Sequence, residues 1–175
     1  VGRAVGADDH RGAADLDAFR AEAREWLDAN VPASIRGDVD AGMRFQGGEK
    51  PQGDHLLWRQ RMGDKGWGVP TWPKAYGGGG LTPAHARIIN QEIERIGTYN
   101  PIFGMGVSMF GPTLLEYGTE EQKQRHIPPI VRGELRWCQG FSEPGAGSDL
   151  AGLQTKCEDM GDHWRINGQK IWTSG

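Results

Sequence analysis

Two short motifs toward the end of the sequence hold the residue types from which a cofactor site is built. The first is Phe141-Ser-Glu-Pro-Gly-Ala-Gly-Ser-Asp149, and the second is Ile166-Asn-Gly-Gln-Lys-Ile-Trp-Thr-Ser-Gly175. The glycine-rich turn of the first motif leaves backbone N–H groups free to bind a diphosphate. Trp172 offers a flat apolar wall for a ring. Hydroxyl groups for the polar edge of that ring come from Ser142, Thr173 and Ser174. The combination suits a flavin nucleotide.

Spacing alone leaves other interpretations of these motifs open. Gly-x-Gly-Ser is common in turns, a strand tryptophan often belongs to a core, and the first motif lacks the third glycine of a dinucleotide-binding GxGxxG. Glu143 and Asp149 are carboxylates beside the turn, and either is a candidate base. A turn-capping role is the simpler interpretation of Asp149.

Composition narrows the class of protein. The 175 residues carry 20 basic and 23 acidic side chains, mixed along the chain, for a net charge of -3. This balance predicts no nucleic-acid partner. No apolar run reaches spanning length and no signal peptide is visible, so the sequence predicts no membrane span and a cytoplasmic location. Cys138, Cys157 and the five His residues lack metal-ligand spacing, so we expect no metal site.

Hydrophobic periodicity and capping residues predict a helical part that must position the two motifs. Thr82-Pro83 is typical of a helix start, Gly97 of a helix end, and Thr119-Glu-Glu-Gln122 of a capping box. Residues 33–53 show no period and predict a loop. The expected helices cover residues 15–30, 54–62, 83–96 and 102–117, the last of these central. A fifth helix begins after Thr119, and Pro128-Pro129 either closes it or lies in a bend between two short helices.

At Arg136 the pattern changes to that of strands. Four strands are expected, at residues 137–141, 155–160, 163–166 and 169–173, with hairpin turns at Gly161-Asp162 and Asn167-Gly168. The fold class is therefore α+β overall, with an all-α domain followed by the first part of a β domain. The expected organisation is a flexible N-terminus over 1–14, a helical domain over 15–134 and an incomplete β domain over 135–175. An open final strand predicts that the sequence is a truncated piece of a longer protein.

Both motifs resemble signature sequences of the acyl-CoA dehydrogenase family. Upstream, Gly66-Trp-Gly-Val-Pro-Thr-Trp-Pro73 and Gly111-Pro-Thr-Leu-Leu-Glu-Tyr-Gly118 resemble segments of that family's N-terminal helical domain. The resemblance runs in the same order from about residue 15 to the end. It implies a helical domain followed by the start of an antiparallel β-barrel domain, with FAD as the cofactor.

The resemblance also implies roles for individual residues. Glu143 corresponds to a residue of the family's structural turn rather than to the base. Ser142 corresponds to the position that faces the flavin ring, Trp172 to the aromatic residue packed beside that ring, and Ser148 to a contact of both the diphosphate and the acyl-CoA. Gln139 stands where many members carry an aromatic or apolar residue. The full expected cofactor-binding set is Gln139, Phe141, Ser142, Gly147, Ser148, Trp172, Thr173 and Ser174, with Ser148 also expected to bind substrate.

The activity implied by the resemblance is α,β-desaturation of an acyl-CoA thioester, as in the β-oxidation of fatty acids and other lipids. A base beyond Gly175 would remove the α proton, so no catalytic residue is expected within this chain, and the 175 residues alone are expected to be inactive. The implied partners are an electron-transfer flavoprotein and further subunits of a homotetramer or mixed oligomer. Open alternatives are an acyl-CoA oxidase, a flavin monooxygenase relative and a non-catalytic subunit of a mixed oligomer.

Overall fold

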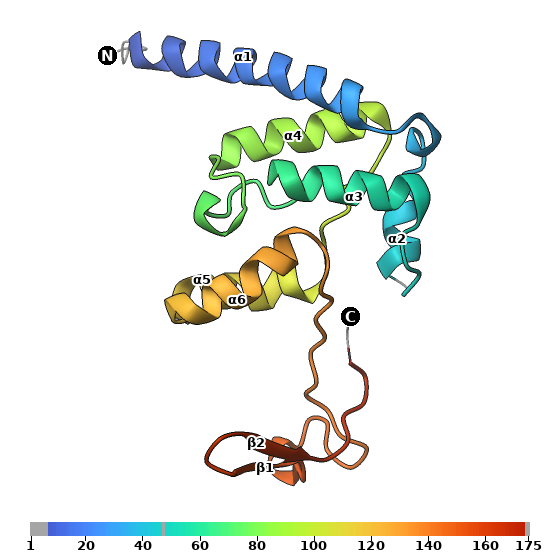
Figure 1. Cartoon of the computed structure of the whole chain (residues 1–175), viewed down its shortest axis with the longest axis vertical. Coiled ribbons are helices and arrows are strands. Elements are labelled where there is room, and N and C mark those ends of the chain that lie inside the picture. The colour runs from blue at the N-terminus through green and yellow to red at the C-terminus, as the bar shows by residue number, and fades with distance from the viewer. Residues whose placement is uncertain (1–6, 47, 174–175) are drawn as a thin grey trace, which may run out of the picture.

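The computed structural model describes residues 7–46 and 48–173, which form a helical body and a small β segment (Figure 1). An extended connection through residues 134–141 joins the two parts. The expected order, helical part first and antiparallel β part second, is confirmed. The elements are α1 Ala7–Asn30, α2 Ala41–Gln46, α3 Gly53–Lys65, α4 Pro83–Ile96, α5 Gly111–Tyr117, α6 Glu120–Val131, β1 Lys156–Asp159 and β2 Trp164–Asn167.

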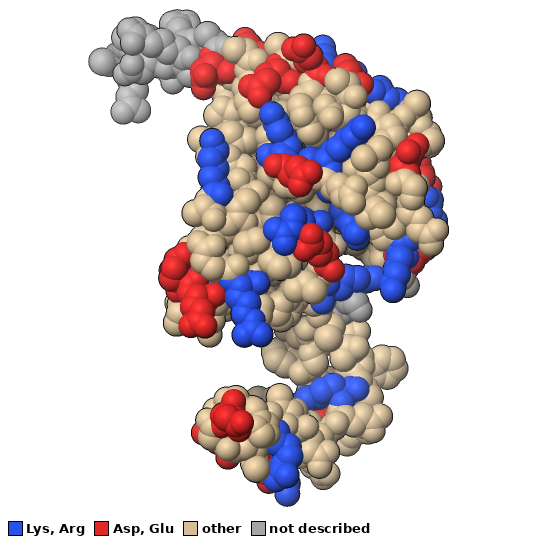
Figure 2. All heavy atoms as spheres, in the orientation of Figure 1, with Lys and Arg blue, Asp and Glu red and all other residues tan. Residues whose placement is uncertain are grey.

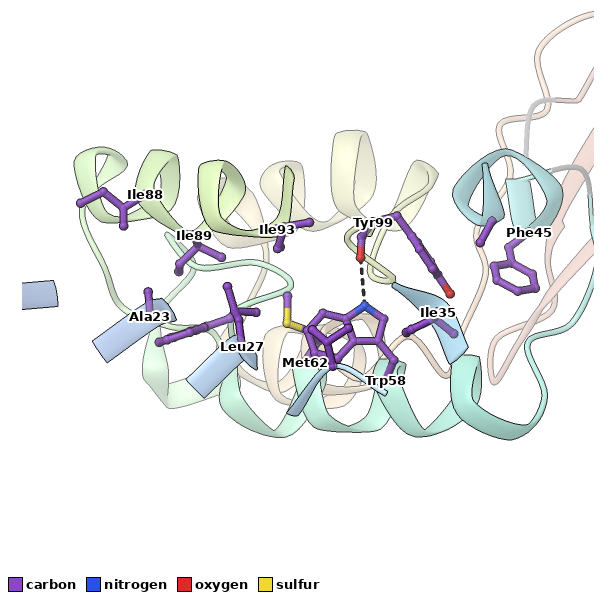
Figure 3. Packing of buried hydrophobic residues seen from close by; sticks show 13 residues of the cluster. Ala23, Leu27, Ile35, Phe45, Trp58, Met62, Ile88, Ile89, Ile93 and Tyr99 are labelled. Carbon is purple, nitrogen blue, oxygen red and sulfur yellow. Dashed lines mark hydrogen bonds between the residues drawn. The ribbon is translucent and has the colours of Figure 1, made fainter. Parts of the chain in front are cut away.

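The main core lies between α1, α3 and α4. Ala23 and Leu27 of α1 are one helical turn apart, so both face this core. Trp58 of α3 is fully buried, and its indole N–H donates to the backbone carbonyl of Tyr99 at 2.9 Å, as Figure 3 shows. The bond satisfies a polar group that burial would otherwise leave unpaired. A second cluster, built around Trp72, Ile102 and the apolar face of α6, lies beneath the first.

An ionic cluster fixes α1 against α4. The Glu92 carboxylate is 2% exposed and accepts hydrogen bonds from three guanidinium groups: Arg20 at 3.2 Å, Arg24 at 3.0 Å and Arg95 at 2.6 Å. Hydrogen bonding, most strongly from Arg24, lowers the pKa of Glu92 to about 2. Because the carboxylate is fully paired, its burial is tolerated.

The helix ends predicted from capping residues are confirmed. The Thr82 hydroxyl accepts from the His85 N–H, and α4 ends at Gly97, whose positive φ of 73° suits glycine. Thr119 and Gln122 form the reciprocal capping box at the start of α6. These local signals act within one turn of the chain, so they can be identified before the fold is known.

Two expectations about the N-terminal third differ from the structure. α1 begins at Ala7, earlier than the expected start at Asp15, so part of the segment expected to be flexible is helical. Alanine, the strongest helix former, is frequent there. Residues 33–53 are not all loop, because α2 forms around the buried residues Ala41 and Phe45. Phe45 packs on the rings of His55 and Tyr99, contacts that a periodicity test over so short a segment cannot detect.

The expected single helix over residues 102–117 is wrong in detail. A π-helical turn at Gly106–Phe110 precedes α5, and the exposed side chains of Met109 and Tyr117 show that this segment is not central among the described residues. Large aromatic side chains approach its glycines: a Cβ at Gly106 would lie 2.7 Å from the Trp137 ring, and one at Gly111 would collide with Trp72. α6 also continues past Pro128-Pro129 to Val131.

The β segment contains one antiparallel hairpin. Lys156 pairs with Asn167 and Asp159 with Trp164, and the chain reverses around Gly161-Asp162 as expected. The strands expected at 137–141 and 169–173 are not formed within the described residues. One hydrogen bond joins the second of these segments to the first motif, from the backbone N–H of Ile171 to the Ser142 carbonyl at 2.9 Å. A strand needs a continuous ladder of such bonds, and this single bond does not provide one.

Among the helices formed by residues 7–46 and 48–173, none combines the length and apolar character that crossing a membrane requires. Over the same residues, the His, Cys, Asp and Glu side chains do not gather into a group of three that could hold a metal ion.

Candidate functional site

The first cofactor motif folds as a tight turn. The Glu143 N–H donates to the Ala146 carbonyl at 2.8 Å, and the Ala146 N–H donates back to Glu143 at 3.0 Å. Pro144 and Gly145 occupy the two corner positions, which suits a fixed φ followed by an unhindered residue. Nothing lies within 4 Å of a Cβ built at Gly145 or Gly147. The outer side of the turn is therefore open, and a bulky ligand can approach its backbone closely.

The Glu143 carboxylate is the polar centre of this segment. It is buried and accepts from the backbone N–H of Gln154 at 2.7 Å, the backbone N–H of Thr155 at 2.9 Å and the Lys170 ammonium at 2.9 Å. Hydrogen bonding from Thr155, then from Gln154 and Lys170, lowers the pKa of Glu143 to about 2. A carboxylate so acidic and so fully engaged is a poor proton acceptor, so Glu143 has a structural role rather than that of a base.

Lys170 ties the second motif to the first. Its Nζ donates both to Glu143 and to the Phe141 carbonyl, the latter at 3.0 Å. Together with the bond from Ile171 to Ser142, this holds two stretches nearly thirty residues apart side by side. Sequence reasoning identified the two motifs but not the residue pair that joins them. The sequence did contain a signal for this pair, because one motif carries the carboxylate of Glu143 and the other the ammonium of Lys170.

The structure places most of the expected site residues on the outside of this segment. Phe141 is 69% exposed and Trp172 is 86% exposed, while Ser142 and Gln139 are half-buried. The hydroxyl-bearing and glycine positions Gly147, Ser148 and Thr173 are exposed. Ser174 lies outside the described residues. Ser142 and Trp172 are brought to neighbouring positions by the Ile171 bond, whereas Gly147 and Ser148 lie beyond the turn.

Trp172 adopts an unusual backbone conformation. Its φ is 54°, in the left-handed region that few non-glycine residues enter. Such a conformation costs on the order of 1–3 kcal/mol and is enriched at functional sites. The indole projects from a strained position rather than packing into a core.

A cavity of about 380 Å³ opens where the connection leaves the helical body. Its wall is largely apolar and includes Phe45, Phe103, Met105, Ile130 and Leu135, to which Arg59, Arg136 and Trp137 add polar groups. The Trp137 ring stacks on Phe110 with centroids 3.7 Å apart, which fixes its position. Sequence reasoning missed this cavity, whose wall includes Gly104 and Gly106.

Charged side chains are unevenly distributed around these features. In the face shown in Figure 2, Lys, Arg, Asp and Glu are interspersed over the helical body, whereas the connection below it carries few of them. The exposed apolar residues of this region include Leu135 and Phe141. An apolar surface next to an open glycine turn is the arrangement that a ligand with a flat ring and a charged tail requires.

Comparison with known proteins identifies the class to which the chain belongs. Residues 13–134 match the family model of the acyl-CoA dehydrogenase N-terminal domain. The acyl-CoA dehydrogenase IpdE1 of Mycobacterium tuberculosis is 39% identical over 163 residues, covering 91% of this chain and 41% of the relative. The chain therefore belongs to the acyl-CoA dehydrogenase family.

Solved structures agree with this assignment. A structure described as the Tcur3481-Tcur3483 steroid ACAD is 38% identical, with a TM-score of 0.61 over 91% of this chain and 39% of that one. The ChsE4-ChsE5 complex from Mycobacterium tuberculosis is 33% identical, with a TM-score of 0.59 over 91% of this chain and 39% of that one. The chain thus spans about two fifths of the length of these relatives.

Proposed function

We propose that this chain supplies the helical domain and one wall of the cofactor site of an FAD-dependent acyl-CoA dehydrogenase that acts in the cytoplasm, in lipid catabolism. The observation that carries the proposal is the Glu143–Lys170 tie, which aligns the open glycine turn with the segment bearing Trp172. Family membership supports the chemistry.

The residues present fit an FAD molecule. The open sides of Gly145 and Gly147 leave room for a diphosphate close to the backbone, and the exposed Ser148 hydroxyl would donate to it. Trp172 and Phe141 would provide apolar contacts for the ring, with Ser142 and Thr173 at its polar edge. Gln139, Gly147 and Ser174 complete the proposed set. When bound, the flavin supplies the acceptor for the β hydride of the thioester.

The chain's own part in the reaction is to bind, orient and exclude water. The 380 Å³ cavity would take the acyl group, because its wall is mainly apolar and its size suits a small to medium acyl chain. Ser148 would contact the thioester side of the substrate as well as the cofactor. The base that removes the α proton is proposed to lie outside residues 1–175, since Glu143 is fully hydrogen-bonded and its pKa is held at about 2.

The names of similar solved structures support a proposal about the protein partners of this chain. One solved relative is described as the ChsE4-ChsE5 complex, and the other has the two-part name Tcur3481-Tcur3483 steroid ACAD. These names favour a mixed assembly over a homotetramer for this protein. An electron-transfer flavoprotein would reoxidise the cofactor, and one solved neighbour, at 26% identity and a TM-score of 0.57, is described as an electron transferring flavoprotein. A mixed assembly in which this chain is the non-catalytic member is the second candidate function.

The test uses the complete protein in which this chain occurs, together with any co-purifying subunit. We expect a yellow protein whose flavin absorbance bleaches on anaerobic addition of an acyl-CoA and returns with an electron-transfer flavoprotein. Stoichiometric peroxide release in air would instead indicate an oxidase. A complete protein that binds neither FAD nor any acyl-CoA contradicts the proposal. The 175 residues alone serve as a control, and we expect weak FAD binding and no turnover from them.

A further inference from the structure

Two residues that line the 380 Å³ cavity each carry a buried hydrogen-bond donor that has no partner among the described residues. The Nε of Arg59 and the Nε1 of Trp137 are both buried, and no group within the described part of the chain accepts a hydrogen bond from either. Both residues line the same cavity. A buried donor left unpaired costs free energy, so each is expected to meet an acceptor when the cavity is filled.

The positions of both donors are fixed by packing. Trp137 stacks on Phe110, and its ring edge lies against Gly106. The aliphatic stem of Arg59 lies against Gly133, where an added Cβ would come within 2.8 Å of its Cδ. Neither side chain is therefore a loose surface group, and each glycine next to them leaves the space that the larger side chain occupies.

The cavity also carries an excess of positive charge. Arg59 and Arg136 line it, and Glu49 is the acidic residue in its wall. Glu49 is already 3.9 Å from the guanidinium of Arg44. Glu134, which lies between the cavity residues Gly133 and Leu135 in the sequence, accepts hydrogen bonds from Arg132 at 2.7 Å and 2.9 Å. The recorded side-chain bond of Arg136 is to the Gln46 carbonyl, at 3.2 Å. Glu49 and Glu134 thus each lie nearest to an arginine that does not line the cavity, although the charge of Arg59 also acts on Glu134.

We propose that this cavity selects an acyl group that carries a carboxylate at its far end, bound by Arg59 and by the indole N–H of Trp137. The inference rests on the proposed acyl-binding role of the cavity and adds the chemical class of the acyl group. The apolar wall would contact the methylene carbons, while the guanidinium and the indole N–H bind the carboxylate oxygens. A site built around such donors discriminates strongly against a substrate that lacks the acceptor.

The experiment compares two CoA thioesters of equal chain length, octanedioyl-CoA and octanoyl-CoA. Binding to the complete protein, with any flavin reduced so that no hydride transfer occurs, is measured by calorimetry. We expect octanedioyl-CoA to bind at least about tenfold more tightly, the scale of one charge-assisted hydrogen bond. Free CoA is measured alongside.

Variants then assign the effect to the two donors. Arg59→Met keeps an apolar stem and should remove about tenfold of the affinity for octanedioyl-CoA without weakening the binding of octanoyl-CoA. Trp137→Phe keeps the ring stack on Phe110 and should give a smaller loss in the same direction. Arg59→Lys should restore part of the preference. Arg125→Met, an exposed arginine of α6 outside the cavity, is the matched control and should leave both affinities unchanged.

The outcomes separate this inference from the proposed function. Equal or weaker binding of octanedioyl-CoA overturns the inference, and so does an Arg59→Met variant that weakens both thioesters and free CoA alike, because Arg59 would then bind CoA phosphates. Selective binding without bleaching of a flavin supports the inference and contradicts the dehydrogenase proposal. Bleaching with octanoyl-CoA alone supports the dehydrogenase and overturns the inference.

Discussion

The helical body and the β segment are held together by different forces. In the helical body, side chains such as Leu27, Trp58 and Met62 are fully buried. Polar side chains there cap helices, as Thr82 does, or form ion pairs from a buried position, as Glu92 does. In the β segment, both strands are exposed along their whole length. Its buried residues within the described range include Glu143 and Ala146.

The two regions therefore owe their rigidity to different interactions. The burial of apolar surface stabilises the helices in proportion to area, and many residues share the effect. An isolated hairpin is marginal in water, so the β segment depends on a few directional bonds around Glu143. A single substitution in the bonds around Glu143 should therefore loosen the β segment without unfolding the helical body. A substitution in the apolar core of the helical body should instead destabilise that whole body.

The largest effect is expected from Trp58→Ala. Loss of a fully buried indole and of its bond to the Tyr99 carbonyl should lower the free energy of unfolding by about 3–5 kcal/mol. Urea unfolding followed by far-ultraviolet circular dichroism measures it. Trp164→Ala, at a 63% exposed position of β2, is the matched control and should change little. Equal losses from the two variants would remove the distinction between the regions.

The next effect concerns pH and the Glu92 cluster. The folded pKa of about 2 lies below the unfolded value of 4.5, so the carboxylate's contribution is complete above about pH 4.5 and is lost as the pH falls toward 2. The three arginines are partly exposed, so we expect a contribution of about 1–3 kcal/mol.

The measurement is the urea stability of the complete protein at several pH values from about 6 to 3. Glu92→Gln should be less stable at neutral pH and should show a smaller dependence on pH through this range. An unchanged pH dependence in Glu92→Gln would show that the α1–α4 cluster does not contribute to the acid sensitivity of the helical body.

A local effect is expected from Glu143→Gln. The amide keeps the shape but loses the charge that pairs with Lys170, so the two motifs should separate more often. Limited proteolysis should cut residues 141–173 roughly tenfold faster, while helix melting stays unchanged. Glu158→Gln on β1 is the control, because it removes one charge and one exposed ion pair, with Arg165, and should change the cleavage rate much less. If Glu143→Gln instead lowered the helix melting temperature, the β segment would not be an independent unit.

The smallest effect is expected from Arg165→Ala. Its guanidinium lies 2.7 Å from Glu158 across the hairpin, but both side chains are more than half exposed. An exposed pair of this kind contributes less than about 1 kcal/mol and weakens with salt. Hydrogen exchange of the hairpin amides at low and high salt measures it. A larger, salt-independent loss would mean that the hairpin surface is covered in the working protein.

Much of the fold could be predicted from local residue patterns. Thr82, Gly97 and Thr119 marked helix ends correctly, because a cap and the groups it satisfies lie within one turn. The turn at Gly161-Asp162 was predicted for the same reason. The short α2 was missed because Phe45 is held by Tyr99, a residue far away in the sequence. The strands expected at 137–141 and 169–173 did not form, because strand propensity needs a paired neighbour.

The family and the two motifs can be recognised from the sequence alone. The motifs also indicate Ser142, Ser148 and Trp172 as candidate cofactor contacts. The resemblance already argued against Glu143 as the base, and the tertiary structure added what holds its carboxylate, namely Lys170 and two backbone amides beyond the turn. The cavity with Arg59 and Trp137 is likewise invisible in the sequence. Caps and turns depend on near neighbours along the chain, whereas cavities and buried charges depend on which distant residues the fold brings into contact.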